Sequence, residues 1–389
     1  MNLNVFTLEQ RILRPLKIDI VFFDAGGGHR AAANALRLAM EQQGRPWEVR
    51  LVNLQETLSS IDLFRQLFNL RLEDVYNLIL RKGWTLGSAQ LLVGMHGLIR
   101  LYHPLQVRLL KKFWGKEAPD VLISVVPNFN RAMYQAIQAV KPGTPYVVVI
   151  TDIADYPPHF WIEKQKQIVF CGSAKAEQQA REMSGAGSTV VRTSGMVLHP
   201  KFYATGEIDR AGEREALGLD PKLPTGLILF GGYGSSVMPL IVERLAPLAG
   251  RMQLIAICGK NEKLKTRMEA MGAAVKMHVV GFTSEVPRYM QAADFMIGKP
   301  GPGSISEALQ MKLPVIVERN AWTLPQERYN ADWVRENGYG IVLGNFREIR
   351  GAVEEMIAPE NLERYRSRAA ATENRAVWEI PERLQELLG

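Results

Sequence analysis

The sequence has few cysteines and no long apolar run. Only Cys171 and Cys258 occur in 389 residues, in separate apolar stretches and without a CxxC pair. A disulfide framework and a zinc knuckle are therefore not supported, and a reducing cytoplasm is expected. Because no run of about 18 uncharged apolar residues occurs, no membrane-spanning helix is expected. The N-terminal segment also lacks the apolar stretch and cleavage site of a signal peptide.

Several catalytic motifs are missing as well. The chain has no GxxxxGK[ST] loop, no HExxH, no GxSxG and no DxD carboxylate pair, which excludes P-loop nucleotide hydrolysis, zinc peptidase chemistry and a nucleophile elbow. Its 47% hydrophobic and 22% charged residues are those of an ordinary globular protein and exclude a disordered, collagenous or coiled-coil chain. Its length suggests two or three domains.

Short apolar runs alternate with helical segments along the chain, a pattern typical of a parallel sheet covered by helices on both faces. The alternation restarts after residue 215, and each half has a glycine-rich turn after its first strand. The sequence therefore predicts an α/β protein of two doubly wound, Rossmann-like domains. The expected strands are 18–23, 48–53, 121–126, 146–150, 167–171, 226–230, 252–258, 275–280, 295–297, 314–318 and 340–343.

The domain boundaries follow from this pattern. We expect an N-terminal domain over residues 1–203, a polar linker over 204–216 and a C-terminal domain over 217–360. The charged helical tail, 361–389, is expected to pack back on the N-terminal domain.

The first motif is DAGGGHRAA, residues 24–32, between a strand and a helix. Its glycines let the backbone approach a ligand closely, and the helix N-terminus favours an anion. His29 at the helix start can act as a general base at neutral pH; the alternative is a tight turn with a locally packed histidine. The segment also fits the loose dinucleotide fingerprint GxGxxA, but the second strand ends in Asn53 and not in the acid that fingerprint requires.

The second motif is GKPGPGSISEAL, residues 298–309, with a helix expected to open at about Ser304. Gly301 and Gly303 leave the backbone at the helix N-terminus free for a diphosphate, and Glu307 is spaced to bind ribose hydroxyls. The alternative is a capping box from Ser304 to Glu307. A third motif, Pro-Gln-Glu at 325–327 with an asparagine at 330, can hold sugar hydroxyls or form an exposed polar loop.

Together these motifs resemble those of the monogalactosyldiacylglycerol synthases and related processive diacylglycerol glycosyltransferases of family 28. DAGGGHRAA resembles their DTGGGHRASA, KPGPGSISEAL their KAGPGTIAEA, and LPVIVERNAWTLPQE their LPIILNDYIAGQE. ITDIADYPPHFW, SGMVLHPKF and VGFTSEVPRYMQAAD are similar to VVTDLVTCHPTWF, GLPIRPSF and VRGFVTKMEECMGACD. The matches keep one order from residue 22 to about 340.

The resemblance implies a GT-B fold with the donor in the C-terminal half and the acceptor in the N-terminal half. It implies His29 as the catalytic residue, either the base or an orienter of acceptor and diphosphate. Its implied donor contacts are Gly232, Gly281, Phe282, Thr283, Lys299, Gly301, Pro302, Gly303, Ser304, Glu307, Gln326, Glu327 and His199. Its implied acceptor contacts are Gly26, Gly27, Gly28, Trp84 and Trp114. The sequence departs from the family pattern at Ala25, Pro300, His199 and the loop around Asp155. His199 puts one phosphate contact in question, and the loop around Asp155 puts the acceptor in question.

One segment of the N-terminal half is rich in basic residues. Residues 61–117 carry nine basic and four acidic residues, and 83–114 combine apolar residues and two tryptophans with Arg and Lys but no acid. This composition is typical of an interfacial amphipathic helix on anionic lipid. The alternative is a core-packed helix pair with a solvated basic face.

The resemblance thus implies an inverting enzyme that moves galactose or glucose from a UDP-sugar to 1,2-diacylglycerol, giving a β-glycosyldiacylglycerol. The expected partners are a UDP-hexose, diacylglycerol and anionic membrane lipids, with a homo-oligomer possible, no nucleic acid, and no metal or other cofactor. The expected location is the cytoplasm, peripherally on the inner face of the membrane. Alternatives are a transferase to a polyprenyl-linked acceptor, a UDP-N-acetylglucosamine 2-epimerase-like enzyme, a non-catalytic nucleotide-sugar-binding module and, last, an NAD-linked oxidoreductase.

Overall fold

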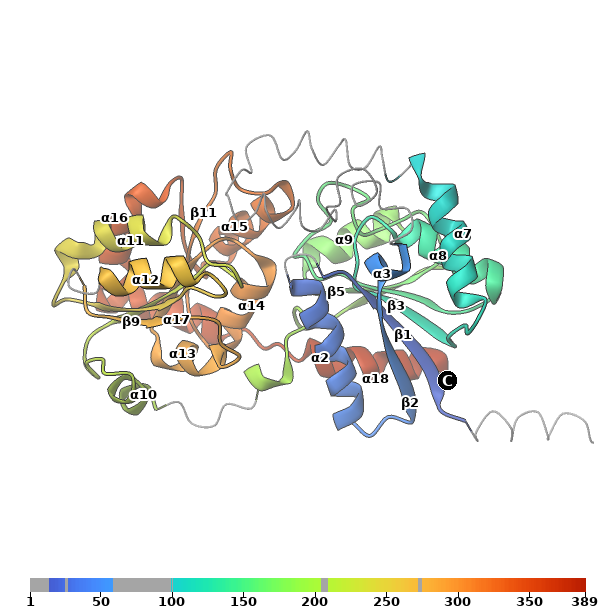
Figure 1. The fold of residues 1–389 in the computed structure, drawn as a ribbon, viewed down its shortest axis with the longest axis horizontal. Coiled ribbons are helices and arrows are strands. Elements are labelled where there is room, and N and C mark those ends of the chain that lie inside the picture. Colours follow the sequence, from blue (N-terminus) through green and yellow to red (C-terminus); the bar gives the residue numbers. More distant parts are fainter. Residues whose placement is uncertain (1–13, 25–26, 59–98, 100, 204–208, 272–274) are drawn as a thin grey trace, which may run out of the picture.

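The computed structural model describes residues 14–24, 27–58, 99, 101–203, 209–271 and 275–389. They form two α/β domains that lie side by side, each built on a six-stranded sheet (Figure 1). Every strand pair in both sheets is parallel. The predicted doubly wound architecture is confirmed.

The N-terminal sheet has the strand order β2-β1-β3-β4-β5-β6. Its strands are β1 (Leu16–Phe22), β2 (Trp47–Asn53), β3 (Val121–Ser124), β4 (Tyr146–Val149), β5 (Ile168–Cys171) and β6 (Thr189–Arg192). β6 was not among the expected strands, because this edge strand has no buried side chain and therefore no apolar run. The helices of this domain are α2 (Gly28–Gln42), α3 (Leu54–Leu58), α7 (His103–Trp114), α8 (Asn130–Val140) and α9 (Ala174–Met183), with a 3₁₀ turn, η2 (Pro200–Phe202).

Alternate side chains of the N-terminal strands enter two separate cores, because successive strand residues point to opposite faces. Ile18 and Ile20 of β1 pack with residues of α2 and of α18 (Ala376–Leu388). Val21 faces the other core, which contains residues of α7, α8 and α9. The sheet is therefore buried on both sides, which explains why its central strands are mostly apolar.

The C-terminal sheet has the order β12-β11-β10-β7-β8-β9. Its strands are β7 (Thr225–Leu229), β8 (Gln253–Ile257), β9 (Met277–Val280), β10 (Phe295–Gly298), β11 (Val315–Glu318) and β12 (Gly340–Leu343). One core lies against α11, α12 and α16, and the other against α13, α14, α15 and α17. The helices are α10 (Arg210–Ala216), α11 (Met238–Leu245), α12 (Glu262–Ala270), α13 (Val286–Ala292), α14 (Pro302–Gln310), α15 (Pro325–Asn337), α16 (Ile349–Met356) and α17 (Pro359–Ala370), with 3₁₀ turns η3 (Ala246–Leu248) and η4 (Phe346–Glu348).

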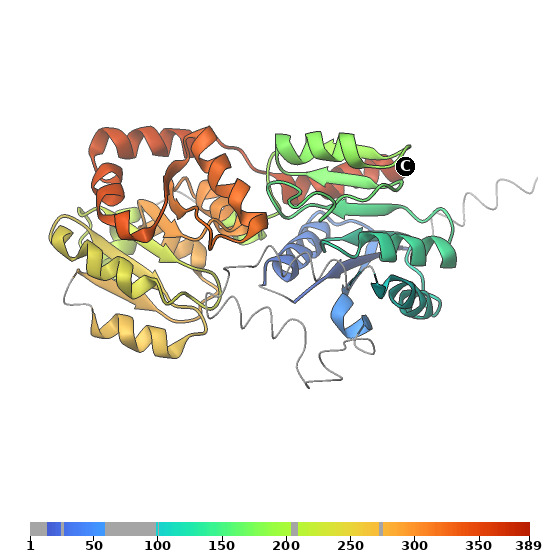
Figure 2. The ribbon, with the colours of Figure 1, turned by 90° about the horizontal axis from the view of Figure 1, so that it is seen from above.

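The chain passes between the domains twice. After the C-terminal domain it returns, and α18 packs against α2 of the N-terminal domain (Figures 1 and 2). The side-chain amide of Gln43 fixes this contact by donating to Trp378 O and to Glu382 Oε1, both at 3.1 Å. α10 lies within the segment predicted as a linker, and it packs against α13 of the C-terminal domain.

A buried ionic cluster fixes α10 and α17, the helices next to the two connections between the domains. Arg214 of α10 lies 2.7 Å from Asp294, and each side chain is 7% exposed. This contact is an ion pair and not an aligned hydrogen bond. Arg366 of α17 pairs with the same carboxylate, to which the backbone N–H of Thr225 also donates at 2.7 Å. α10 and α17 are therefore anchored to the C-terminal domain through one aspartate.

Among the described residues, no helix is long and apolar enough to cross a membrane.

Candidate active site

The first strand and the first described helix place His29 at the carboxyl edge of the N-terminal sheet. α2 begins at Gly28 and is preceded by Gly27, whose φ of 82° lies in the left-handed region that favours glycine. The helix has no side-chain cap and no acid in its first turn. Its first backbone N–H groups are therefore open to a polar or anionic ligand.

His29 is half-buried and makes two defined contacts. Its Nδ1 lies 3.3 Å from Thr151 Oγ1, and its ring centroid lies 5.7 Å from that of Trp161. Burial lowers the pKa of His29 to about 4, against a smaller opposing effect of a backbone hydrogen bond with Val125. The imidazole is therefore neutral near pH 7 and can both donate and accept a hydrogen bond.

The loop that follows β4 supplies two residues for which the sequence predicted no role, Asp152 and Trp161. Trp161 is fully buried, and its indole N–H donates to Asp152 Oδ2 at 2.8 Å. Asp155 shapes the loop by accepting hydrogen bonds from the backbone N–H of Trp161 at 2.7 Å and of His159 at 3.1 Å. The available signal was the position of Asp152 just after a buried strand, at the edge where such sheets bind ligands.

In the C-terminal domain, α14 presents an open N-terminus. The helix begins at Pro302, two residues earlier than predicted, and Gly301 precedes it without a side-chain cap hydrogen bond. Ser304 Oγ donates back to Gly301 O at 3.1 Å, so the alternative capping box is not formed. A Cβ on Gly303 would meet nothing within 4 Å, which leaves space for a ligand over the helix start.

Glu307 lies in α14, close to the N-terminal domain's Lys201. Burial raises the pKa of Glu307 to about 7, and the positive charge of Lys201 partly opposes this shift. Lys201 Nζ donates to Ser284 O at 2.6 Å and so bridges η2 and the loop after β9. A desolvated carboxylate of this kind is stabilised by hydrogen bonds from hydroxyl groups, and a ribose supplies two such hydroxyls.

The third motif forms the start of α15 and not an exposed loop. Glu327 is 8% exposed, and its Oε1 accepts a hydrogen bond from Lys299 Nζ at 2.6 Å. The amide of Asn330, on the same helix, donates to Pro300 O at 2.8 Å. These contacts join the α15 N-terminus to the residues just before α14. Gln326, between Pro325 and Glu327, is partly exposed.

Two glycine-containing loops lie at the same edge of the sheet. Gly232 O, after β7, accepts from Lys260 N at 2.8 Å. Lys260 Nζ lies 5.0 Å from the ring centroid of Phe282, which is 65% exposed. Gly281 and Thr283 flank this ring and are partly exposed. The loop predicted to contact the base, at Phe282, thus lies next to the loop of Gly232, which was predicted as a further donor contact.

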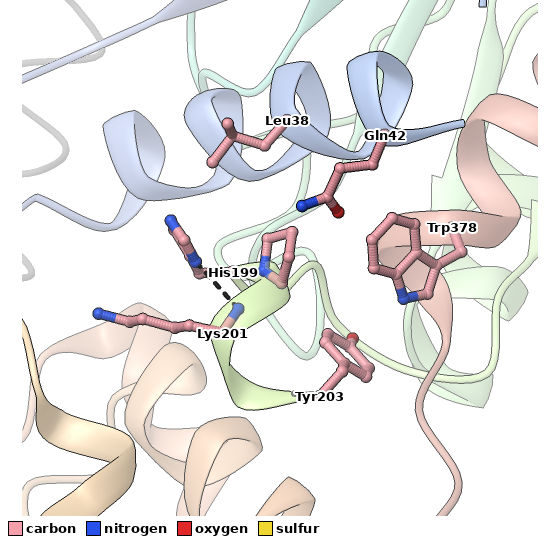
Figure 3. A pocket seen from close by; sticks show the side chains of 7 residues that line it. Leu38, Gln42, His199, Lys201, Tyr203 and Trp378 are labelled. Atoms are coloured by element: carbon pink, nitrogen blue, oxygen red, sulfur yellow. Dashed lines mark hydrogen bonds between the residues drawn. The ribbon is translucent and has the colours of Figure 1, made fainter. Parts of the chain in front are cut away.

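His199 caps the start of η2, where it lines a cavity of about 440 Å³ (Figure 3). Its Nδ1 accepts a hydrogen bond from Lys201 N at 3.2 Å. Burial lowers the pKa of His199, and the charge of Lys201 adds to this effect. The other residues lining the cavity come from α2, η2 and α18 and are Leu38, Gln42, Pro200, Lys201, Tyr203 and Trp378.

Of the predicted acceptor contacts, Gly27 and Gly28 lie beside His29, whereas Trp114 does not reach the surface. Trp114 is 0% exposed, and its indole N–H donates to Asp19 Oδ2 at 2.9 Å inside the N-terminal core. It is therefore a core residue and not the acceptor contact that the sequence predicted. Gly26 and Trp84 lie outside the described residues.

The two halves of the site meet across the domain interface. The rings of Tyr156 and Tyr329, one from each domain, are 5.7 Å apart. The charges of Lys299 and Glu327 act on Asp152 of the opposite domain. Within the described residues, no group of three or more His, Cys, Asp or Glu side chains is arranged to hold a metal ion.

Two Rossmann-like domains that meet in this way define the GT-B class of fold. MurG from Acinetobacter baumannii aligns with a TM-score of 0.62 at 13% identity, over 96% of this chain and 100% of that one. A UDP-GlcNAc 2-epimerase from Neisseria meningitidis, solved bound to UDP-GlcNAc, aligns with a TM-score of 0.59 at 14% identity, over 96% and 99% of the chains. At these identities the likeness concerns the fold alone.

Sequence comparison finds similarity to the glycosyltransferases of family 28. Residues 227–381 match the glycosyltransferase family 28 C-terminal domain. Monogalactosyldiacylglycerol synthase 1 of Arabidopsis thaliana is 28% identical over 373 residues, which cover 90% of this chain and 66% of that protein. Probable monogalactosyldiacylglycerol synthase 2 of Oryza sativa subsp. indica is 29% identical over 353 residues, covering 85% and 71%. The chain spans about two thirds of the length of these relatives. Together the findings support a family 28 glycosyltransferase of GT-B fold.

Proposed function

We propose that the protein transfers a hexose, galactose or glucose, from a UDP-sugar to 1,2-diacylglycerol, with inversion at the anomeric carbon. The observation that carries the donor half is the open N-terminus of α14, where Gly301 provides no side-chain cap and a Cβ on Gly303 would meet nothing within 4 Å in the described part of the chain. Such a terminus stabilises the negative charge that develops on UDP as it leaves. Glu307 would hold the ribose, and the Lys299–Glu327 pair the hexose.

The acceptor half is supported by the similarity to the monogalactosyldiacylglycerol synthases over 90% of the chain. His29, at the opposing edge of the N-terminal sheet, would bind the acceptor hydroxyl. Its neutral imidazole can accept a hydrogen bond from that hydroxyl and fix its direction of attack.

The surface of α7 supports docking on an anionic membrane. One side of the helix is buried against the core at Gln106, Leu110 and Trp114. The other side is exposed at Leu105 and Arg108, and Leu101, just before the helix, is 73% exposed. Apolar and basic side chains on one stripe can enter the headgroup layer while the cations meet anionic lipid. We propose that this stripe brings the enzyme to its lipid acceptor.

The test is release of UDP by the purified protein. UDP-galactose and UDP-glucose are supplied separately, each with and without diacylglycerol in liposomes containing anionic lipid. Release that requires diacylglycerol with one donor is the expected result, and it would identify the sugar. Release from neither donor in the presence of diacylglycerol would refute the acceptor assignment.

A 2-epimerase-like enzyme is the second candidate, since solved epimerases share the fold. Such an enzyme needs no acceptor lipid. UDP-GlcNAc turnover without any liposome would favour it, and it would bind anionic liposomes no better than neutral ones.

A further inference from the structure

Asp152 is a buried carboxylate at the candidate site, and one of its oxygens forms no hydrogen bond with the residues that the structure describes. It is 8% exposed and follows β4 by three residues, at the carboxyl edge of the sheet. Oδ2 accepts the indole N–H of Trp161, and among the described residues Oδ1 forms no hydrogen bond. This carboxylate oxygen can accept a hydrogen bond from a substrate hydroxyl, and the partly desolvated surroundings strengthen such a bond.

Charged groups from both domains face Asp152. Glu327 and Lys299 act on it from the C-terminal domain, and Asp155 acts from its own loop. Burial is the largest influence and raises the pKa of Asp152 to about 7; Glu327 and Asp155 add to this effect, while Trp161 and Lys299 oppose it. The carboxylate therefore changes its protonation state within the range in which a general base is most effective.

His29 is less suited than Asp152 to take up a proton as a general base. Its low pKa means that an imidazolium would form only at acid pH. The groups that act on it, burial and the Val125 backbone, include no charge from the C-terminal domain. Trp161 connects the two side chains, since its ring lies against His29 while its N–H holds Asp152.

We propose that Asp152 is the general base of the transfer and that His29, uncharged, orients the acceptor. The inference rests on the proposed function. The Asp152 carboxylate takes the proton of the acceptor hydroxyl as that oxygen forms a bond to the anomeric carbon. The bond from that carbon to the phosphate oxygen breaks, and UDP leaves with the electron pair. Asp152 then returns its proton to solvent.

The first experiment replaces Asp152 by Asn, which keeps the shape and can still accept from Trp161. We expect kcat to fall by about 10² to 10⁴ while UDP affinity stays within about twofold of the wild type. Glu386→Gln, which removes the same charge from an exposed site on α18, is the matched control and should leave both values unchanged. A D152N enzyme within threefold of the wild-type kcat would overturn the proposal.

The second experiment assigns the titrating group. The wild-type kcat/KM should rise with pH through an apparent pKa near 7. Trp161→Phe removes the donor that stabilises the carboxylate, so this rise should move upward by about one pH unit. His29→Asn should lower kcat but retain the rise. Loss of the rise in His29→Asn, or no movement of it in Trp161→Phe, would overturn the assignment.

The same assays separate the two proposals. If the wild type releases no UDP with diacylglycerol, the proposed function fails before any variant is compared. If the wild type turns over and D152N does so equally well, only the role of Asp152 fails.

Discussion

Replacing Asp294 by Asn is expected to destabilise the C-terminal domain strongly. The substitution leaves Arg214, 7% exposed, without the carboxylate that lies 2.7 Å away, and Arg366 loses the same partner. Breaking a buried pair by removing one member costs about 3–5 kcal/mol, because the remaining charge stays desolvated. At about 2–4 °C per kcal/mol for a domain of this size, the unfolding midpoint should fall by about 6–20 °C.

Scanning calorimetry of D294N beside the wild type measures this shift. The control is Arg383→Ala, which removes an ion pair whose side chains are 60% and 62% exposed; it should cost no more than about 1 kcal/mol. If D294N loses no more stability than the control, the buried cluster does not anchor α10 and α17, and the reasoning is refuted.

Three further predictions concern the candidate active site and the exposed stripe of α7. His29→Ala should lower turnover at least 100-fold with UDP affinity retained, and near-normal turnover would contradict its role. The pKa of Glu307 is raised above its unfolded value, so the folded state holds the proton more tightly and stability falls as pH rises from about 4.5 to about 7. Glu307→Gln should therefore raise the unfolding midpoint at pH 8 by a few degrees and weaken UDP binding about tenfold; unchanged UDP affinity would exclude a ribose contact. Replacing Arg108 and Lys112 together by Glu should weaken binding to anionic liposomes more than tenfold, at about 1 kcal/mol per basic residue, and leave binding to neutral liposomes unchanged in a flotation assay.

Much of the fold could be predicted because its signals are local. A buried parallel strand is a short apolar run bounded by turns, and eleven such runs coincide with strands of the structure. β6 was missed because it lies at an edge with its side chains exposed. The glycine motifs also predicted where α2 and α14 begin, because the backbone at such a helix start favours glycine.

The site was predicted less completely, because its contacts join distant parts of the chain. The pairing of Lys299 with Glu327 and of Trp161 with Asp152 depends on how loops from different strands converge. Trp114 shows the opposite error: composition suggested a surface residue, but it lies four residues after Leu110 and shares its buried helix face. Helical phase, and not composition, decides which side of α7 faces outward.

The return of α18 to the N-terminal domain has a consequence for synthesis of the chain. Ile380 and Leu384 complete the core that β1 and α2 begin, yet they follow the whole C-terminal domain in the chain. At about 5–20 residues per second, the ribosome needs many seconds to reach them after α2 emerges. Until then, α2 covers this face of the N-terminal sheet without the apolar side chains of α18. The core of the N-terminal domain is therefore completed only after the C-terminal domain has been translated.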